Sequence, residues 1–498
     1  MESIRIKNFR SILDSKDIYL NNINIILGKN SSGKSSFLRL FPMFKQTVRH
    51  ELRGPILWFD DSYDFGDFSN SLSRYATEDK NIMFGFTLNL PFKKCNSNKC
   101  SDCFIEFANN IFLKNATKSS LDIYLSSDEN GCFLKMIKAK VKDFNIELSI
   151  NKRNDDIHIY INGNLYDNIH IKWKYNTKGI LPDIIGKDES PYRTIFNIVS
   201  KFGSNKEKVK YTQKEVNDIF NIKDIDRQKI YLSLKQKKNN SFAKLITESL
   251  NSTSPDFITI SDSIILLNII EFLLFMDKSI STDFSKSHYM TPLRYSFTRY
   301  IRNRDLSVDE IEPSGKNVME YIMSLNEDER KSYLAFLEDS LGIKIMIEGK
   351  DDNKSIFIQK GNEKDNIIDV GYGYSQVLPI ATMLWDVAHK QQKCEFSETI
   401  IIEQPEIHLH PSMQSDLVTL FINALMLSKE KGNTIKLIIE THSSNIVNKI
   451  GRHIREGKLD DKMVSVYLFE KDNGITNITS TSYDDKGRIQ RWPIGFLE

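Results

Sequence analysis

The pattern of apolar and polar positions near the N-terminus predicts two strands, a glycine-rich loop and a helix. Apolar and polar side chains alternate along residues 3–8, and residues 23–27 are mostly apolar. Both segments are therefore expected to be strands. A loop rich in glycine and serine follows the second strand and leads into a helical segment at residues 35–47. This order of strand, loop and helix is the context that a phosphate-binding loop requires.

The middle of the chain changes character twice. Residues 104–166 favour strands, and the alternation over residues 156–163 ends in Asn162-Gly163, a turn signal that is typical of an antiparallel hairpin. From residue 187 to about residue 283 the chain is polar, rich in lysine and asparagine, and mostly helical in pattern. We expect this segment to be an insertion or an arm.

Strands and helices alternate in the C-terminal part. Residues 399–402 and 434–439 are apolar strands, while residues 412–429 and 444–456 show the spacing of helices. Such alternation indicates an α/β fold with a largely parallel sheet. We therefore predict three parts, namely an N-terminal lobe with an antiparallel β-rich subdomain at residues 1–186, a helical insertion at residues 187–290, and a C-terminal lobe at residues 291–498.

Composition limits the class of protein. The 498 residues are 40% hydrophobic and 27% charged, with 68 basic and 66 acidic side chains, so the whole-chain charge does not argue for nucleic acid. Between residues 201 and 240, eleven lysines and arginines accompany five acidic residues, which suits either a solvated helical arm or a nucleic-acid contact. The charged N-terminus lacks the apolar core of a signal peptide, and polar residues interrupt the apolar stretch 257–276. We therefore expect a buried helix there and a cytoplasmic protein without a membrane span.

Cysteine usage indicates a second candidate site. Five cysteines are too few for a disulfide scaffold. Three of them lie within nine residues, and with a fourth they could hold a structural Zn²⁺ ion, the alternative being free cytosolic thiols. The candidate ligands are Cys95, Cys100, Cys103 and Cys132.

The glycine-rich loop matches the pattern GxxxxGK[ST]. Glycines at positions 28 and 33 let the backbone approach a triphosphate, and the dipole of the following helix adds to the attraction. Lys34 can reach the β- and γ-phosphates of ATP, and the Ser35 hydroxyl can ligate Mg²⁺. The predicted nucleotide-binding residues are Gly28, Lys29, Asn30, Ser31, Ser32, Gly33, Lys34, Ser35 and Ser36.

Two later strand ends carry polar side chains that could complete this site. Glu403 follows three isoleucines and is expected to meet Ser35 across the Mg²⁺ ion, although an acid at such a place can also cap a helix. His442 follows the apolar strand 434–439 and could sense the γ-phosphate or orient the attacking water. Gln404 stands where a catalytic carboxylate would be expected.

Residues 371–376 form a second candidate anion-binding surface. Their side chains and glycines precede an apolar helix, whose N-terminus would attract phosphate. Because the chain already has one phosphate-binding loop, we expect this surface to cap the nucleotide held by a second copy of the chain; the alternative is a plain glycine turn with a serine cap. The residues concerned are Gly371, Gly373, Ser375 and Gln376.

These motifs resemble those of ABC-type ATPases of the SMC, RecF and OLD group, and most closely those of stand-alone OLD-like ATPase subunits of prokaryotic anti-phage defence. The resemblance covers both ends of the chain and leaves residues 187–283 unmatched. It rests on Ile4-Arg5-Ile6-Lys7-Asn8-Phe9-Arg10-Ser11 as the first strand, residues 371–376 as the signature, Glu403-Gln404-Pro405-Glu406-Ile407-His408-Leu409-His410-Pro411 as the Walker B motif and D-loop, Thr441-His442-Ser443 as the switch, Pro292-Leu293-Arg294, and Trp492-Pro493-Ile494-Gly495-Phe496.

The resemblance implies an ABC ATPase head that is built from both chain ends. Two heads would sandwich two ATP molecules with Mg²⁺, so a homodimer or a larger homo-oligomer is expected. In the group an Asp-Glu pair precedes the Walker B proline, whereas here Glu403 takes the Asp place and Gln404 the Glu place. Glutamine cannot accept a proton at neutral pH, so Gln404 could position water, Glu406 could act as the base, and slow hydrolysis is expected.

The resemblance also implies a role in defence. The expected partner is a separate effector nuclease of the HNH or TOPRIM type, a reverse transcriptase with its non-coding RNA is a further candidate, and direct contact with nucleic acid stays open. Two other readings remain: a RecF- or SMC-like repair ATPase that acts directly on DNA, and a scaffold that ATP locks without being hydrolysed. Arg294 and the arginines and aromatic residues after it suit contacts within a head, between subunits or with nucleic acid.

Overall fold

The structure is a computed structural model of the 498-residue chain. It describes residues 1–60, 63–77, 80–90, 117–141, 144–151, 156–166, 171–175, 178–186, 191–202, 212–302, 308–349, 353–390 and 397–492. Contacts within the chain group it into two compact units. Unit 1 comprises Met1–Gln46, Trp58–Lys80 and Thr282–Glu498, and unit 2 comprises Thr47–Leu57 and Asn81–Ser281.

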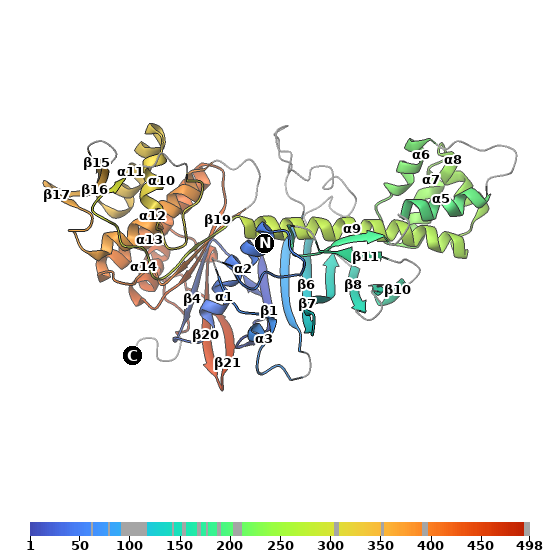
Figure 1. The fold of residues 1–498 in the computed structure, drawn as a ribbon, viewed down its shortest axis with the longest axis horizontal. Coiled ribbons are helices and arrows are strands. Elements are labelled where there is room, and N and C mark those ends of the chain that lie inside the picture. Colours follow the sequence, from blue (N-terminus) through green and yellow to red (C-terminus); the bar gives the residue numbers. More distant parts are fainter. Residues whose placement is uncertain are drawn as a thin grey trace. The chain divides into compact units, whose positions relative to one another are not determined.

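Unit 1 is an α/β unit with a mixed sheet (Figure 1). Its strands are β1 (Ser3–Phe9), β2 (Ile12–Asp14), β3 (Ile18–Tyr19), β4 (Ile23–Gly28), β13 (Ser287–Met290), β18 (Glu398–Glu403), β19 (Ile435–Glu440), β20 (Val464–Asp472) and β21 (Ile475–Thr481). They lie in the order β1-β2-β21-β20-β4-β19-β18-β13, and β3 pairs with β1. All neighbours from β20 to β13 are parallel, which confirms the predicted α/β class.

Strand β4 is an inner strand of the parallel run and lies between β19 and β20. All six of its residues are buried, because a parallel strand covered on both faces has no solvent side, and this explains its apolar sequence. The exception, Asn24, is fully buried, and its side-chain amide donates hydrogen bonds to the carbonyls of Asn21 and Leu437. The phosphate-binding loop therefore leaves from the most enclosed strand of unit 1.

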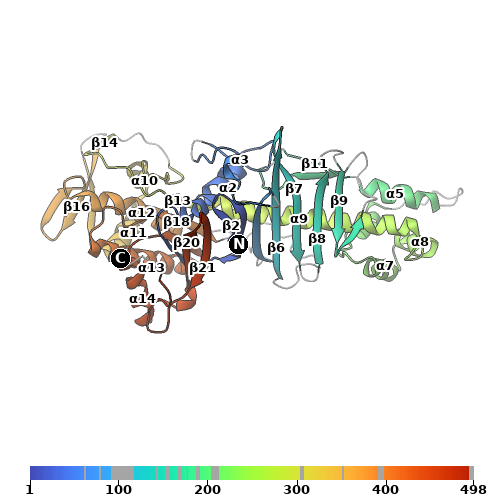
Figure 2. The ribbon, with the colours of Figure 1, turned by 90° about the horizontal axis from the view of Figure 1, so that it is seen from below.

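Helices and a small antiparallel sheet complete unit 1. The helices are α1 (Lys34–Leu38), α3 (Phe68–Ser71), α10 (Val318–Ser324), α11 (Glu327–Leu341), α12 (Tyr372–His389), α13 (Pro411–Glu430), α14 (Ser444–Arg455) and the 3-10 turn η2 (Asp461–Met463), while α2 (Leu40–Arg49) ends in unit 2. The small sheet contains β14 (Ile301–Arg302), β15 (Lys344–Glu348), β16 (Asn353–Lys360) and β17 (Glu363–Asn366). Buried side chains of α10 to α14 form one hydrophobic core with β4, β18, β19 and β20, and Figure 2 shows α11, α12 and α13 side by side.

Local signals set the starts of the helices nearest the site. Helix α12 follows Gly371, whose φ of 91° lies in the region that favours glycine. Helix α13 begins with Pro411, which suits a first helical position because its missing N–H would have no helical partner. The Ser443 side chain accepts a hydrogen bond from the Ile446 N–H and caps α14.

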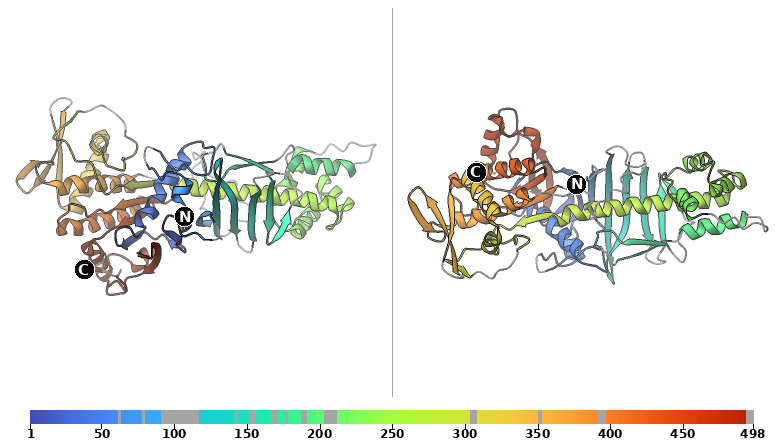
Figure 3. Two further views of the ribbon diagram at one scale, coloured as in Figure 1. Left: turned by 60° about the horizontal axis from the view of Figure 1, so that its bottom comes forward. Right: turned by 90° about the horizontal axis from the view of Figure 1, so that it is seen from above.

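Unit 2 combines an antiparallel sheet with helices. Its elements are β5 (Ile82–Leu90), β6 (Thr117–Asp128), β7 (Gly131–Val141), β8 (Phe144–Asn151), β9 (Asp156–Ile161), β10 (Asn164–Tyr166), β11 (Ile171–Lys174), β12 (Asp183–Gly186), α5 (Pro191–Phe202), α6 (Gln213–Phe220), α7 (Arg227–Gln236), α8 (Ser241–Ser249) and most of α9 (Pro255–Ser285). Strands β5 to β10 pair in chain order, and the predicted hairpin over residues 156–163 is the pair β9–β10. Helix α9 crosses one face of this sheet, and α5 to α8 gather beside it (Figures 2 and 3).

Helix α9 contains the apolar stretch that the sequence predicts to be a buried helix. Among the described residues it alone is long and apolar enough to cross a membrane by length and composition, with a mean hydropathy of 1.9 in its most apolar window. That window is 67% buried inside the protein. Because buried core helices pass the same test, this helix is weak evidence for a membrane span.

Candidate functional site

A cavity of about 560 Å³ lies beside the loop that follows β4. This volume falls within the range of small-molecule sites. From the loop region it is lined by Asn30, Ser31, Gly33, Lys34, Ser35 and Ser36, and Gln404 and Glu440 line it from the ends of β18 and β19. Other segments of unit 1 contribute the basic side chains of Arg10, Arg74 and Lys471 and the ring of Tyr75. The fold thus brings the loop and the distal motifs to one polar, positively charged cavity.

Two loop positions accept only glycine. Gly28 and Gly33 have φ values of 153° and 101°, which other residues rarely adopt. A Cβ atom at Gly28 would lie 2.2 Å from the carbonyl oxygen of Phe469, and one at Gly33 would lie 2.6 Å from Oγ1 of Thr476. The Thr476 hydroxyl donates to the carbonyl of Ser32 at 2.8 Å. Strands β20 and β21 therefore hold the loop closely, and larger residues would push it away.

Lys34 and Ser35 share one carboxylate partner, Glu440. The ammonium group of Lys34, 3% exposed, donates to the carbonyls of Gly28 at 2.9 Å and Lys29 at 2.8 Å, and it lies 3.5 Å from Glu440. The Ser35 hydroxyl donates to the other Glu440 oxygen at 3.4 Å. Burial lowers the pKa of Lys34 despite the neighbouring acid. Burial likewise raises the pKa of Glu440 to about 7, with Lys34 opposing the shift and nearby Glu403 adding to it.

Glu403 has a different set of partners. Its carboxylate accepts a hydrogen bond from the Tyr289 hydroxyl and lies 3.4 Å from Nε of Arg39. Glu403 is 2% exposed and Tyr289 6%, so this contact is buried. The sequence leads us to expect Glu403 opposite Ser35, but the carboxylate that contacts the Ser35 hydroxyl in the structure is Glu440.

The backbone at Gln404 is held in an unusual conformation. Its φ is 43°, a value that residues other than glycine adopt mainly at turns and functional sites. The Gln404 N–H donates to the Glu440 carbonyl at 2.9 Å. Arg294, 7% exposed, donates to the carbonyls of Glu403 at 3.0 Å and Gln404 at 3.3 Å, and burial lowers its pKa to about 10. Arg294 therefore acts inside unit 1, where it fixes the turn that presents Gln404 to the cavity.

Glu406 and His442 are joined through the backbone. The Glu406 carboxylate accepts hydrogen bonds from the His442 N–H at 2.6 Å and from the Thr441 hydroxyl at 2.9 Å. Burial raises the pKa of Glu406, and these hydrogen bonds oppose the shift. Burial and the charge of Lys34 lower the pKa of His442. The Glu406 carboxylate therefore holds the loop that carries His442.

The four signature residues lie apart from the cavity wall. Gly371 and Gly373 flank the exposed Tyr372 at the start of α12, and Tyr372 is 67% exposed. Ser375 and Gln376 are buried within unit 1. None of these described residues is among those that line the cavity beside Lys34. The residues predicted to form the signature therefore do not line the cavity beside the glycine-rich loop of their own chain.

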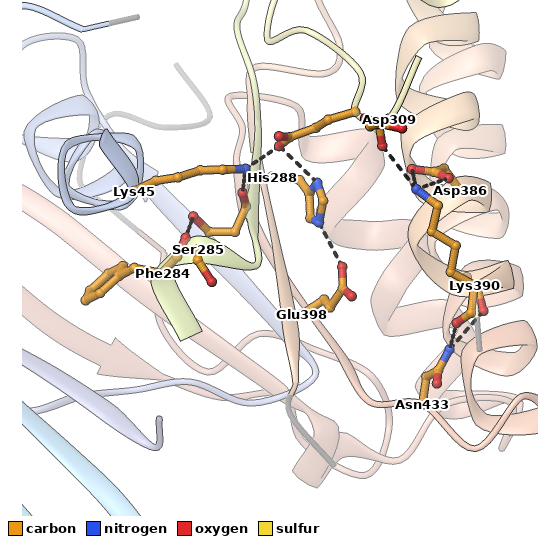
Figure 4. Close-up of polar contacts among 12 residues, drawn as sticks. Lys45, Phe284, Ser285, His288, Asp309, Asp386, Lys390, Glu398 and Asn433 are labelled. Carbon is orange, nitrogen blue, oxygen red and sulfur yellow. Dashed lines mark hydrogen bonds and ion pairs between the residues drawn. The ribbon is translucent and has the colours of Figure 1, made fainter. Parts of the chain in front are cut away.

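A partly buried polar network lies in the same unit. His288 on β13 is placed between two carboxylates, with Glu398 at 2.8 Å and Glu310 at 3.5 Å from its ring nitrogens. Lys45 of α2 also pairs with Glu310, and Figure 4 shows Lys45, His288 and Glu398 pointing into one cluster. Burial by itself lowers the pKa of His288, but the hydrogen bonds to Glu310 and Glu398 outweigh it and raise the pKa.

Some sequence-predicted residues fall outside the described chain. These are Cys95, Cys100, Cys103 and residues 493–496; the fourth candidate zinc ligand, Cys132, is half-buried on β7. Among the described residues, no group of three or more His, Cys, Asp or Glu side chains is arranged to hold a metal ion.

Conversely, sequence reasoning missed Glu440, Arg39 and Tyr289. Glu440 had a usable signal, because β18 and β19 are both apolar strands that end in glutamate. Arg39 and Tyr289 stand in segments without a motif, so no pattern marks them as partners of Glu403.

The chain matches one family profile and is similar to several known proteins. The profile of the AAA ATPase domain family, AAA_15, matches residues 1–447. Endonuclease GajA of Bacillus cereus (strain HuB5-5) is 37% identical over 84 residues, which are 16% of this chain and 12% of GajA. Two solved structures, an SMC head bound to the C-winged helix domain of ScpA and the recombination mediator RecF, are 10% and 12% identical with TM-scores of 0.36 and 0.26. The matches cover 97% and 96% of this chain, respectively, and 97% of each of those chains.

The family profile spans most of the chain and includes β4, β18 and β19, at whose ends the glycine-rich loop, Gln404 and Glu440 line the cavity. The glycine-rich loop at the end of a central parallel strand supplies the phosphate-binding feature that such a domain needs. The chain therefore belongs to the AAA ATPase domain family.

Proposed function

We propose that this protein binds ATP with Mg²⁺, hydrolyses it slowly, and uses the nucleotide to control a separate effector nuclease in bacterial anti-phage defence. The observation that carries the nucleotide part is the cavity lined by Lys34, Ser35, Gln404 and Glu440. The effector and defence parts rest on the motif resemblance and on the similarity to GajA, which spans 84 residues.

The residues of the cavity fit a magnesium nucleotide. Basic side chains suit a triphosphate, and backbone N–H groups of the loop can cradle its oxygens. The Ser35 hydroxyl and a carboxylate at a strand end, Glu403 or Glu440, are ligands that Mg²⁺ accepts. When bound, the ion would neutralise the charge that develops on the γ-phosphate. Tyr75 offers an aromatic face for the base.

We expect slow hydrolysis because residue 404 is a glutamine. Gln404 lines the cavity and can hold a water molecule by hydrogen bonds, but it cannot take the proton of that water. The Glu406 carboxylate already accepts hydrogen bonds from the Thr441 hydroxyl and the His442 N–H. These hydrogen bonds must break before Glu406 can act as a base. The same observation favours the second candidate function, a scaffold that ATP locks without turnover.

We expect a second copy to complete each site. The signature segment does not line the cavity of its own chain, and Gly371 and Tyr372 are exposed. Two chains arranged head to head could therefore each cap the nucleotide of the other. This arrangement predicts that ATP promotes a homodimer.

The nucleotide part is tested by binding and turnover with the full chain. The Kd for a fluorescent ATP analogue is measured for wild type, Lys34→Ala and the control Lys331→Ala, an exposed lysine on α11. Loss of a charged hydrogen-bond donor to the phosphates should weaken binding about 10- to 100-fold for Lys34→Ala alone. Equal affinity of Lys34→Ala and wild type would refute the site. Single-turnover assays then separate a slow enzyme from a scaffold, which would form an ATP-dependent dimer and release no phosphate.

The effector part needs a different experiment. The tagged chain is co-expressed with the product of its neighbouring gene, and co-purification is followed with and without ATPγS. A stable complex with a nuclease whose DNA cleavage depends on the state of the nucleotide supports the defence function. Direct, nuclease-independent binding of the chain to DNA would instead favour the repair reading.

A further inference from the structure

The cavity contains one acidic group. Among the described residues that line it, Glu440 is the sole carboxylate, and the same lining includes the basic side chains of Lys34, Arg10, Arg74 and Lys471. Its two oxygens lie 3.5 Å from Nζ of Lys34 and 3.4 Å from Oγ of Ser35. Glu440 is 2% exposed, so these contacts are made away from bulk water.

An anion at this place conflicts with the nucleotide unless a cation accompanies it. Lys34 and Ser35 are the groups that would contact the terminal phosphates, so a bound triphosphate would bring several negative charges next to the Glu440 carboxylate. Repulsion between buried like charges is strong, because little water screens it. A divalent cation between the carboxylate, the Ser35 hydroxyl and the phosphates removes this conflict, and oxygen atoms of these kinds are the ligands that Mg²⁺ prefers.

The neighbouring acid, Glu403, is engaged elsewhere. Its carboxylate accepts a hydrogen bond from the Tyr289 hydroxyl and lies 3.4 Å from Arg39. These contacts link the end of β18 to β13 and to the residue after α1, and they neutralise the charge of Glu403 without a metal ion. The partners of Glu403 thus lie outside the cavity lining, whereas Lys34 and Ser35, the partners of Glu440, are part of that lining.

We propose that Glu440, together with Ser35, ligates the Mg²⁺ ion that accompanies the nucleotide, while Glu403 anchors Arg39 and Tyr289. This assignment rests on the proposed binding of ATP and reverses the order expected from the motif, in which the first acid after the isoleucine run meets Ser35. Glu440 gains this role because β19 separates β4 from β18 and so brings its terminal carboxylate nearest to the loop.

The test uses Mn²⁺ as a paramagnetic substitute for Mg²⁺ on the full chain with ATPγS. Binding is read from the loss of the EPR signal of free aqueous Mn²⁺, so it does not depend on turnover. Wild type is compared with Glu440→Gln and with the matched control Glu403→Gln. We expect Glu440→Gln to lower the affinity for Mn²⁺ at least about 10-fold, which is roughly the loss seen when groups of a metal site are removed. Glu403→Gln should lower this affinity less than about 3-fold. Mn²⁺ affinity of Glu440→Gln equal to that of wild type overturns the assignment.

Two further results complete the test. If Glu440→Gln fails to fold, the Mn²⁺ affinities of Glu440→Asp and Glu403→Asp are compared instead. Each of these variants keeps the carboxylate but shortens the side chain by one methylene group. A larger loss of Mn²⁺ affinity at position 440 supports the assignment, and an equal or smaller loss overturns it. If wild type itself binds no ATPγS, the proposed nucleotide function fails and the assignment with it; if wild type binds ATPγS and Glu440→Gln keeps its Mn²⁺, the assignment alone fails.

Discussion

Glu403 and Glu440 lie directly beside each other, paired in register at the ends of the parallel strands β18 and β19. Both are 2% exposed, so two buried acids occupy adjacent positions at one edge of the sheet. Each has its own cation, Arg39 for Glu403 and Lys34 for Glu440. Glu440 is thus among the residues that line the cavity, whereas Glu403 is not.

Restoring a carboxylate at position 404 should speed hydrolysis. Gln404 lines the cavity, so Gln404→Glu would place a proton acceptor where glutamine can only position water. General-base catalysis is worth about 10²- to 10⁴-fold, and we expect a rise in single-turnover rate of at least about 10-fold. Phosphate release with excess enzyme measures it. A conservative control is Gln236→Glu at an exposed position on α7, which should leave the rate unchanged. No increase with Gln404→Glu would show that another step limits turnover.

Gly33→Ala should destabilise the loop more than a glycine change elsewhere. A Cβ atom at position 33 would meet Thr476 Oγ1 at 2.6 Å, in addition to the cost of about 1–3 kcal/mol for holding alanine at positive φ. Gly432→Ala is the matched control, because Gly432 also has positive φ but nothing within 4 Å of a Cβ. We expect a lower urea midpoint and weaker ATP binding for Gly33→Ala, and only a lower midpoint for Gly432→Ala. Equal ATP affinity of both variants would contradict the close contact with β21.

Arg294→Met should loosen the turn at Gln404. The change removes a buried guanidinium that donates to the carbonyls of Glu403 and Gln404, and it leaves these carbonyls without that donor. Losing hydrogen bonds from a buried charged group costs about 3 kcal/mol, which denaturant unfolding can measure. The control is Arg299→Met, an exposed arginine paired with Asp369, which should barely move the urea midpoint. Similar midpoints for both variants would mean that Arg294 does not hold the turn.

The His288 cluster should make stability depend on pH near neutrality. The pKa of His288 is raised in the folded protein, so its contribution is fully present below the unfolded value of about 6.5 and is lost as the pH rises through the folded pKa. The pKa of Glu310 is lowered, because His288 and Lys45 outweigh the effect of burial, so its contribution is lost only on acidification below the unfolded value. We expect the urea midpoint of wild type to fall between pH 6.5 and pH 9, and His288→Gln to show a flatter profile. Parallel profiles would show that His288 is not charged in the folded state.

Local patterns were enough for much of the fold and for half of the site. The apolar run 23–27, the glycines at 28 and 33, and Lys34 and Ser35 follow one another in the chain, so neighbouring residues alone determine the strand, the turn and the helix start. The strands ending at Glu403 and Glu440 were also recognisable, because their isoleucine runs alternate with helical segments. A predicted helix at residues 35–47 corresponds to α1 and α2, which are separated at Arg39.

The sequence by itself therefore determined a phosphate-binding loop, an α/β head and the residues that could serve it. Only the tertiary structure decided which of them meet. The strand order β4-β19-β18 determines whether Glu403 or Glu440 contacts Ser35. The position of the Glu403 side chain depends on Arg39 and Tyr289, which come from distant segments of the chain. Strand order and side-chain contacts arise from packing between distant segments, so they cannot be predicted from the periodicity within one segment.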